Sequence, residues 1–175
     1  MEMELKLVIY GDPVLRQKAE PVTDINGELK TLIESMAEFM YKLKGLGLAA
    51  NQIGIAKRFF IMDIAQKEGS PQLEVYINPE ILSTEGETYY EEGCLSIPGY
   101  YAKVKRYKNL IIKAYDLEGK EFTKELSGLR AIAFQHEFDH LEGILFIDRL
   151  SPLKKEFFKR WWKKHGPLHK KESSY

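Results

Sequence analysis

The sequence has little cysteine, no excess charge of either sign and no long apolar run. Cys94 is the single cysteine, which excludes an intrachain disulfide and indicates a reducing compartment. No stretch approaches the roughly 20 apolar residues needed to cross a membrane, and the N-terminus lacks a signal-peptide pattern. The 26 basic side chains balance 26 acidic ones, which argues against a general nucleic-acid binder. We therefore expect a cytoplasmic protein that does not enter a membrane.

Internal repeats, long linkers and low-complexity blocks are also missing. A chain of 175 residues normally forms one domain around one core. We expect a catalytic domain over residues 1–151, followed by a basic C-terminal helix and tail over residues 152–175.

Three segments carry helical signals. Apolar residues recur at three- and four-residue steps between Leu29 and Leu43, which predicts an amphipathic helix with Gly45 as its C-terminal stop. A second helix is predicted over residues 129–141, and a third over residues 152–164, with Ser151 as its N-cap and Pro152 at its first position.

β-type signals occupy a short segment near the start and most of the chain between the first two helices. Asp116–Gly119 predicts a hairpin turn. The expected strands are residues 6–10, 59–62, 75–77, 110–115 and 121–126. Helix, strands and then helices indicate an α+β fold. We expect largely antiparallel sheets packed around the helix 129–141, with a C-terminal helix beside them.

The helix 129–141 contains an H-E-x-x-H pentapeptide at residues 136–140. Residues four apart share one face of a helix, so the imidazoles of His136 and His140 can reach one metal ion. Glu137 is displaced around the axis by ~100°, which places its carboxylate beside that ion as an acid and base. A chance pair of histidines on an exposed helix is the alternative interpretation.

The flanking residues favour a ligand. Leu129, Ile132 and Ala133 form an apolar face that runs up to the histidines, where burying two imidazoles without partners would be costly.

A third ligand must come from elsewhere in the chain. Cys94 follows a glycine directly after a strand signal, and a Cys/His/His set leaves a fourth position for water. A lone cysteine can also be a small buried hydrophobe, and Glu156 or His165 are alternative ligands. His165 and His169 enclose Gly166-Pro167, which breaks a helix, so we interpret that pair as tail residues.

Three motifs in order resemble those of the peptide deformylase family. They are Gly-Leu-Gly-Leu-Ala-Ala-Asn-Gln at residues 45–52, Glu-Gly-Cys-Leu-Ser at 92–96 and Gln-His-Glu-Phe-Asp-His at 135–140. The likeness covers roughly residues 7 to 153. It implies an enzyme that hydrolyses the formyl group from the N-terminal formylmethionine of newly synthesised polypeptides and releases formate.

The resemblance also implies roles for residues of all three motifs. Cys94 joins the two histidines as a metal ligand, and Glu137 is the catalytic carboxylate. The Gln52 side-chain amide and the Leu95 backbone N–H form the oxyanion hole. The implied cofactor is one divalent ion, Fe²⁺ in the cell, with Zn²⁺, Ni²⁺ or Co²⁺ in preparations.

For the substrate, the resemblance implies that backbone groups of Leu46, Gly47 and Gly93 pair with the peptide as an added strand. Leu129, Ile132 and Ala133 project beside His136, and we expect them to line the pocket for methionine. Many relatives carry an arginine where this chain has Tyr101, so contact with the peptide beyond methionine stays open.

The segment after Ser151 is basic with an apolar stripe. A helix packed on the domain with its charged side in water is one interpretation. The other, implied by the resemblance, is a helix that docks on the ribosome.

Three rival functions remain at this stage. One is a zincin-like peptidase with Glu156 as third ligand. The second is a thiol hydrolase with Cys94 as nucleophile. The third is a non-enzymatic domain with a structural metal.

Overall fold

The computed structural model describes residues 4–167. Their five strands form one antiparallel sheet in the order β1-β2-β3-β4-β5. The strands are β1 (Gly47–Ala49), β2 (Phe59–Met62), β3 (Glu74–Cys94), β4 (Ile97–Tyr115) and β5 (Glu121–Ser127), and the α-helices are α1 (Gly27–Lys42), α2 (Gly128–Leu141) and α3 (Pro152–His165). Four short 3-10 helices complete this part: η1 (Pro13–Arg16), η2 (Ala50–Ile53), η3 (Ala65–Glu68) and η4 (Phe146–Arg149).

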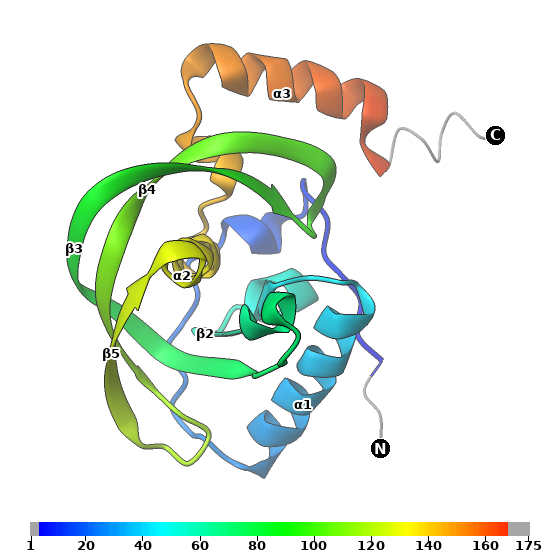
Figure 1. Ribbon diagram of the computed structural model, residues 1–175. Coiled ribbons are helices and arrows are strands. Elements are labelled where there is room, and N and C mark those ends of the chain that lie inside the picture. The colour runs from blue at the N-terminus through cyan, green and yellow to red at the C-terminus, as the bar shows by residue number, and fades with distance from the viewer. Residues whose placement is uncertain (1–3, 168–175) are drawn as a thin grey trace.

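The sheet bends around α2 (Figure 1). The long hairpin of β3 and β4 makes most of this curve, and its register shifts between Ile77 and Glu80, between Ile81 and Ser83, and between Glu92 and Cys94. Such bulges add an unpaired residue to one strand and increase its bend and twist. The expected α+β fold around the H-E-x-x-H helix is confirmed.

Local signals fix most element ends. The Asn26 side chain accepts a hydrogen bond from the Leu29 N–H (3.0 Å) and caps α1, and Ser151 caps α3 by accepting from the Lys154 N–H (3.2 Å). In the turn between β4 and β5, Asp116 accepts from two backbone N–H groups. The predicted hairpin and the Ser151 cap are confirmed.

Two local predictions were wrong. Residues 6–10 form no strand, because their backbone bonds go to separate segments: the Val8 N–H donates to Gln52 (2.7 Å) and the Tyr10 N–H to Ser96 (2.9 Å). The left-handed residue after α1 is Lys44 (φ 60°), whereas Gly45 was expected to end the helix.

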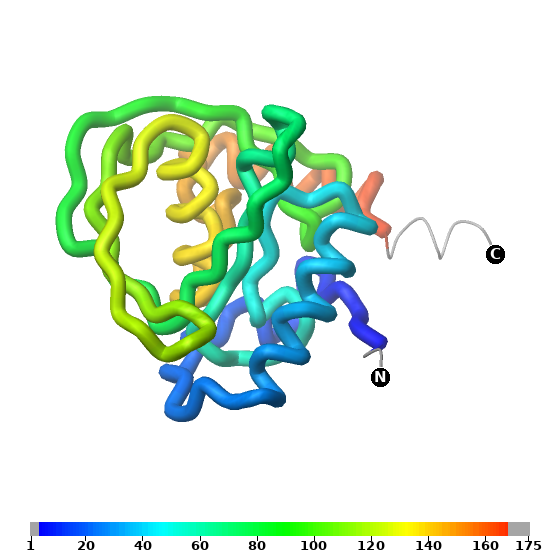
Figure 2. The backbone as a smooth tube through the Cα atoms, turned by 60° about the horizontal axis from the view of Figure 1, so that its bottom comes forward, coloured from blue at the N-terminus to red at the C-terminus, as the bar shows by residue number. Residues whose placement is uncertain are grey.

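Three buried clusters fill the space between the layers. The first joins the sheet to α2 through residues such as Phe60, Tyr76 and Phe134, and the second joins α1 to β1 and β2. The third lies where the tip of the β3–β4 hairpin meets η4 and α3. Figure 2 shows α2 enclosed by the curved sheet with α1 outside it. The site therefore forms where α2, β1 and the hairpin tip meet.

Candidate metal centre

Three side chains that could bind one metal ion converge from two elements far apart along the chain. Cys94 ends β3, and His136 and His140 lie on α2. One donor atom from each, the Cys94 Sγ and one ring nitrogen of each histidine, lie within 4.8 Å of one another. The Cys94 Sγ lies 3.4 Å from the His140 Nε2, and the ring centroids of His136 and His140 are 5.1 Å apart. A thiolate and two imidazoles at this spacing suit one divalent transition-metal ion.

Other ligand candidates lie elsewhere in the described chain. Glu156 is on α3, where it pairs with Lys159 at 3.4 Å, and the His165 ring lies 5.4 Å from that of Trp161 at a tilt of 39°. Within residues 4–167, Cys94, His136 and His140 are the group of three such side chains that could share an ion. His169 lies outside the described residues.

Glu137 is buried between α2 and β1, with 4% of its surface exposed. Burial raises the pKa of its carboxyl to about 7, against the attraction of the neighbouring His136. Its Oε1 atom is buried without a protein partner in the described chain. A carboxyl with this pKa can take up and release a proton near neutral pH. Its orphaned oxygen suits a solvent or substrate group, and the metal implied by the donor set fits beside it.

Gln52 presents its amide N–H₂ toward Cys94 and Ser96. Its Oε1 accepts from the Ala49 N–H (2.9 Å), which fixes the amide so that Nε2 faces the Ser96 Oγ (3.1 Å) and the Cys94 Sγ (3.6 Å). The side chain is 1% exposed. It is therefore a pre-oriented donor at the edge of the donor set.

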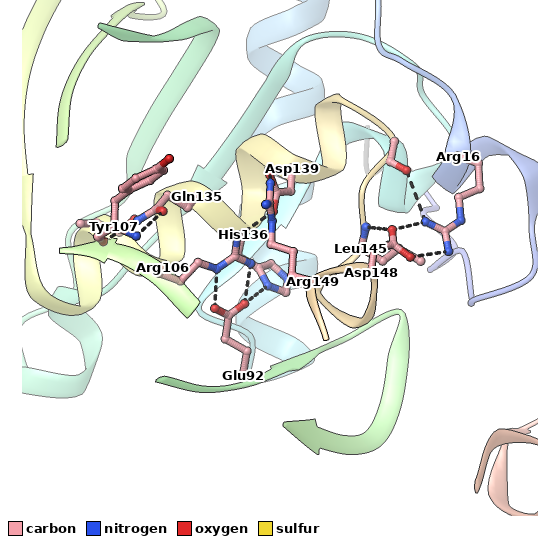
Figure 3. A network of polar contacts seen from close by, with 12 residues as sticks. Arg16, Glu92, Arg106, Tyr107, Gln135, His136, Asp139, Leu145, Asp148 and Arg149 are labelled. Atoms are coloured by element: carbon pink, nitrogen blue, oxygen red, sulfur yellow. Dashed lines mark hydrogen bonds and ion pairs between the residues drawn. The ribbon is translucent and has the colours of Figure 1, made fainter. Parts of the chain in front are cut away.

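A network of ion pairs joins α2 to the β3–β4 hairpin (Figure 3). Glu92 receives two bonds from Arg106, at 2.6 and 2.8 Å, and its Oε1 lies 2.9 Å from the His136 Nδ1. Arg106 also donates to Asp139 at 2.7 Å, and Arg149 donates twice to the same carboxylate. The network orients the His136 ring so that its Nε2 faces the site.

The network also sets the charge of Glu92. Burial would raise the pKa of this carboxyl, but its bonds to Arg106 and His136 outweigh burial and lower the pKa to about 2. Glu92 is therefore an anion across the physiological pH range. The sequence prediction missed the roles of Glu92, Arg106 and Asp139. Glu92 and Asp139 lie within the motifs at residues 92–96 and 135–140, but nothing local in the sequence pairs either of them with Arg106.

A cleft of about 450 Å³ opens over these groups. Nearly all the predicted site residues border it, and His140 alone lies deeper, with 1% exposed. Tyr101 also borders the cleft, and its ring lies against Gly93. The predicted residues in the lining are Leu46, Gly47, Gln52, Gly93, Cys94, Leu95, Leu129, Ile132, Ala133, His136 and Glu137.

Fold and site together are those of a metal-dependent hydrolase of the H-E-x-x-H type, in which Cys94, His136 and His140 could hold one ion. The sequence model of polypeptide deformylase matches residues 4–156, and the chain belongs to that family. Family members are metal-dependent enzymes that remove the formyl group from the N-terminal formylmethionine of new polypeptides, and this chain is an enzyme of that kind. Among the described residues, no helix is long and apolar enough to cross a membrane.

Individual relatives support this assignment. The peptide deformylase of Thermodesulfovibrio yellowstonii is 49% identical over 159 residues, which cover 91% of this chain and 96% of that protein. The one of Syntrophobacter fumaroxidans is 48% identical over 91% of this chain and 94% of that protein. The crystal structure of a peptide deformylase from Legionella pneumophila superposes with a TM-score of 0.85 at 43% identity, covering 91% of this chain and 94% of that one.

Proposed function

We propose that this deformylase works with Cys94, His136 and His140 as metal ligands and Glu137 as acid and base. The observation that carries the proposal is the meeting of these four side chains at one cleft, together with the Gln52 amide. The zincin-like and thiol-hydrolase alternatives each leave part of this arrangement without a role.

The chemistry is the hydrolysis of a formamide. When bound, a divalent ion at these ligands lowers the pKa of water to about 7 and polarises the formyl oxygen. Glu137 takes the proton of the attacking water as the new C–O bond forms. It then gives that proton to the nitrogen as the C–N bond breaks, which yields formate and a free amine.

Gln52 and Leu95 stabilise the charge that develops on the formyl oxygen. The Gln52 Nε2 is held by the bond between its own Oε1 and the Ala49 N–H, so it needs no reorganisation during the reaction. The Leu95 backbone N–H is the second donor. One such donor contributes roughly 2.7–4 kcal/mol in related oxyanion holes.

The peptide enters as an extra strand between β1 and the free edge of β3. Backbone groups of Leu46, Gly47 and Gly93 are the pairing partners, and all three residues line the cleft. The side chain of methionine occupies the apolar pocket that α2 offers beside His136. That pocket is lined by Leu129, Ile132 and Ala133.

The test is metal content and formate release from formyl-Met-Ala-Ser, with protein purified without oxygen. We expect one Fe²⁺ per chain in the wild type, because Cys/His/His ligands suit ferrous iron. Cys94→Ala should lose both metal and activity. Retention of metal by this variant would support the zincin-like peptidase, and activity that survives complete chelation would support the thiol hydrolase.

We further divide the chain into a catalytic domain, residues 1–151, and a C-terminal segment, residues 152–175, whose described part, residues 152–167, adds no side chain to the candidate ligand group. Five cations on α3 are exposed, and we propose that they dock the enzyme on ribosomal RNA near new chains in the cytoplasm. They are Lys154, Lys159, Arg160, Lys163 and Lys164.

Co-sedimentation with ribosomes at several salt concentrations tests the docking. The double variant Lys159→Glu/Lys163→Glu should bind less and depend less on salt, because each lost phosphate contact flattens the salt slope by about one unit. Lys30→Glu, on the exposed face of α1, is the control for altered charge elsewhere. Equal binding by all three proteins would rule out α3 as the docking surface.

A further inference from the structure

The tip of the β3–β4 hairpin carries Cys94 but has few strand partners. β2 pairs with β3 only as far as Ile77, and β5 pairs with β4 only from Asn109 onward. Between these limits the described strands pair only with each other. A two-stranded ribbon is marginally stable by itself and twists freely. The position of its tip therefore depends on what packs against it.

Helix α3 packs on this tip (Figure 1). Phe158 is 1% exposed and its ring lies 4.9 Å from that of Tyr100, at an edge-to-face angle of 66°. The Trp161 ring lies 5.1 Å from that of Tyr100, and it also covers Gly99, where an added Cβ would lie 3.4 Å from the Trp161 Cη2. α3 thus holds two consecutive residues of β4.

The residues held by α3 border the metal ligands and the cleft. Phe158 and Ile97 belong to one buried cluster, against which Cys94 packs. Ile97 is the residue that pairs with Cys94 across the hairpin turn, and Gly99 lines the cleft. A displacement at Tyr100 would pass through three residues of β4 to the thiol.

The N-terminal segment also contacts the hairpin tip and α3, through Tyr10. The Tyr10 N–H donates to the Ser96 carbonyl in the hairpin turn (2.9 Å), and the Tyr10 ring lies 5.1 Å from the rings of both Phe158 and Trp162. The turn after Cys94 is therefore fixed by a backbone bond whose donor residue is itself packed on α3.

We propose that α3, through Phe158 and Trp161, is a positioning element of the metal centre that sets Cys94 against the two histidines of α2. This inference rests on the proposed role of Cys94 as a ligand. It gives α3 a function within the enzyme that is separate from the docking of its charged face. A misplaced thiolate weakens metal binding and spoils the geometry of the cleft, as loss of supporting contacts does at other metal sites.

The experiment uses the full chain loaded with Co²⁺, whose thiolate charge-transfer band reports the bond to sulfur. The variants are Phe158→Ala and Trp161→Ala, with Phe157→Ala as the matched control, since the neighbouring Phe157 is 51% exposed. The readouts are the band, the rate of Co²⁺ loss to a chelator, and kcat and KM for formyl-Met-Ala-Ser, all measured well below the unfolding temperature.

We expect both variants to lose Co²⁺ about 10-fold faster and to fall about 10-fold in kcat/KM, the usual scale for lost supporting contacts at a metal site. Phe157→Ala should stay within about twofold of the wild type, a difference under ~0.5 kcal/mol. The thiolate band should weaken in both alanine variants, whereas Phe158→Leu and Trp161→Phe should keep the band of the wild type. Trp161 is only partly buried, so its variant decides the question should Phe158→Ala fail to fold.

Different results would overturn the proposed function and the positioning role of α3. A wild-type protein without a thiolate band and without formate release would overturn the proposed function. A wild type that has both, beside α3 variants that unfold at lower temperature but match it in band, metal loss and kcat/KM, would overturn only the positioning role. α3 would then be a stabilising helix.

Discussion

At the scale of single residues, three glycines around the cleft leave room for a side chain from another element. A Cβ on Gly45 would lie 2.6 Å from the Leu95 Cδ1, one on Gly47 would lie 2.5 Å from the Glu137 Oε2, and one on Gly93 would lie 2.5 Å from the Tyr101 ring. Real Cβ atoms do not approach this closely, so any larger residue at these positions would push the neighbouring side chain out of its place beside the cleft.

Gly47→Ala tests this at the catalytic carboxylate. The new methyl group must displace Glu137, and a shift of about 1 Å at a reacting group can cost 10²-fold in rate. We expect kcat for formyl-Met-Ala-Ser to fall by one to two orders of magnitude, with metal content unchanged. Gly27→Ala is the control, because nothing lies within 4 Å of its added Cβ. Unchanged kcat in Gly47→Ala would show that Glu137 tolerates displacement.

Gln52→Glu separates the two functions of the Gln52 amide. The substitution keeps an oxygen that can accept from the Ala49 N–H, but it replaces the Nε2 donor near Cys94. Loss of one oxyanion donor should lower kcat by about 10²–10³. A circular dichroism spectrum and unfolding temperature like those of the wild type would exclude a folding defect. Retained kcat would remove Gln52 from the oxyanion hole.

At the scale of elements, α2 is joined to the β3–β4 hairpin by charges as well as by apolar packing. Arg106 of β4 bridges Glu92 of β3 and Asp139 of α2, and its side chain is 2% exposed. Removing one partner of such a network leaves a buried charge unpaired, which costs roughly 3–5 kcal/mol. The network thus ties the two elements that carry the metal ligands.

The network makes the free energy of unfolding depend on pH in the acid range. The folded pKa of Glu92, about 2, lies below the reference value of 4.5, so its stabilisation is present above pH 4.5 and is lost as the pH falls toward 2. At 1.36 kcal/mol per pKa unit the shift corresponds to about 3 kcal/mol. The difference in free energy of unfolding between wild type and Glu92→Gln should therefore shrink between pH 5 and pH 2.

Urea unfolding at several pH values measures this difference. Glu87→Gln is the control, because Glu87 pairs with Lys105 at an exposed position of the same hairpin. Exposed pairs contribute about 0–1 kcal/mol, so its difference from the wild type should stay small at every pH. A Glu92→Gln difference that is constant from pH 7 to pH 2 would contradict the lowered pKa.

At the scale of the whole molecule, the proposed metal site between β3 and α2 would link metal binding to folding. The ligands come together only in the folded chain, so bound metal stabilises that state by mass action. With free metal at 1,000 times its dissociation constant, the gain is about 4 kcal/mol. We expect a chelator to lower the unfolding temperature of the wild type but not that of Cys94→Ala. Equal shifts in both proteins would place the metal elsewhere.

Local patterns predicted much of this molecule. The sequence predicted α2 and α3 nearly to the residue, because the period of a helix and the Ser151 cap of α3 involve residues within a few positions of one another. The spacing of His136 and His140 predicted that they share a face, since that geometry is internal to the helix. The turn at Asp116 was found for the same reason: its side chain bonds to backbone only two and four residues away.

Relations between distant residues could not be read in this way. Arg106 and Asp139 are 33 residues apart, and no local pattern pairs them. The short strand β1 and the real lengths of β3 and β4 depend on partners across the sheet. The predicted strand at residues 6–10 was wrong because its apolar alternation matches a strand, while its hydrogen bonds go to two different segments.

The sequence by itself determined the helices α2 and α3, the Ser151 cap of α3 and the common face of His136 and His140, because each depends on residues within a few positions of one another. Only the tertiary structure decided that Cys94 meets the two histidines, that Arg106 holds Glu92 and Asp139 together, and that Phe158 packs on the hairpin tip. The physical reason is that these contacts join residues far apart along the chain, which approach only when the sheet curves around α2.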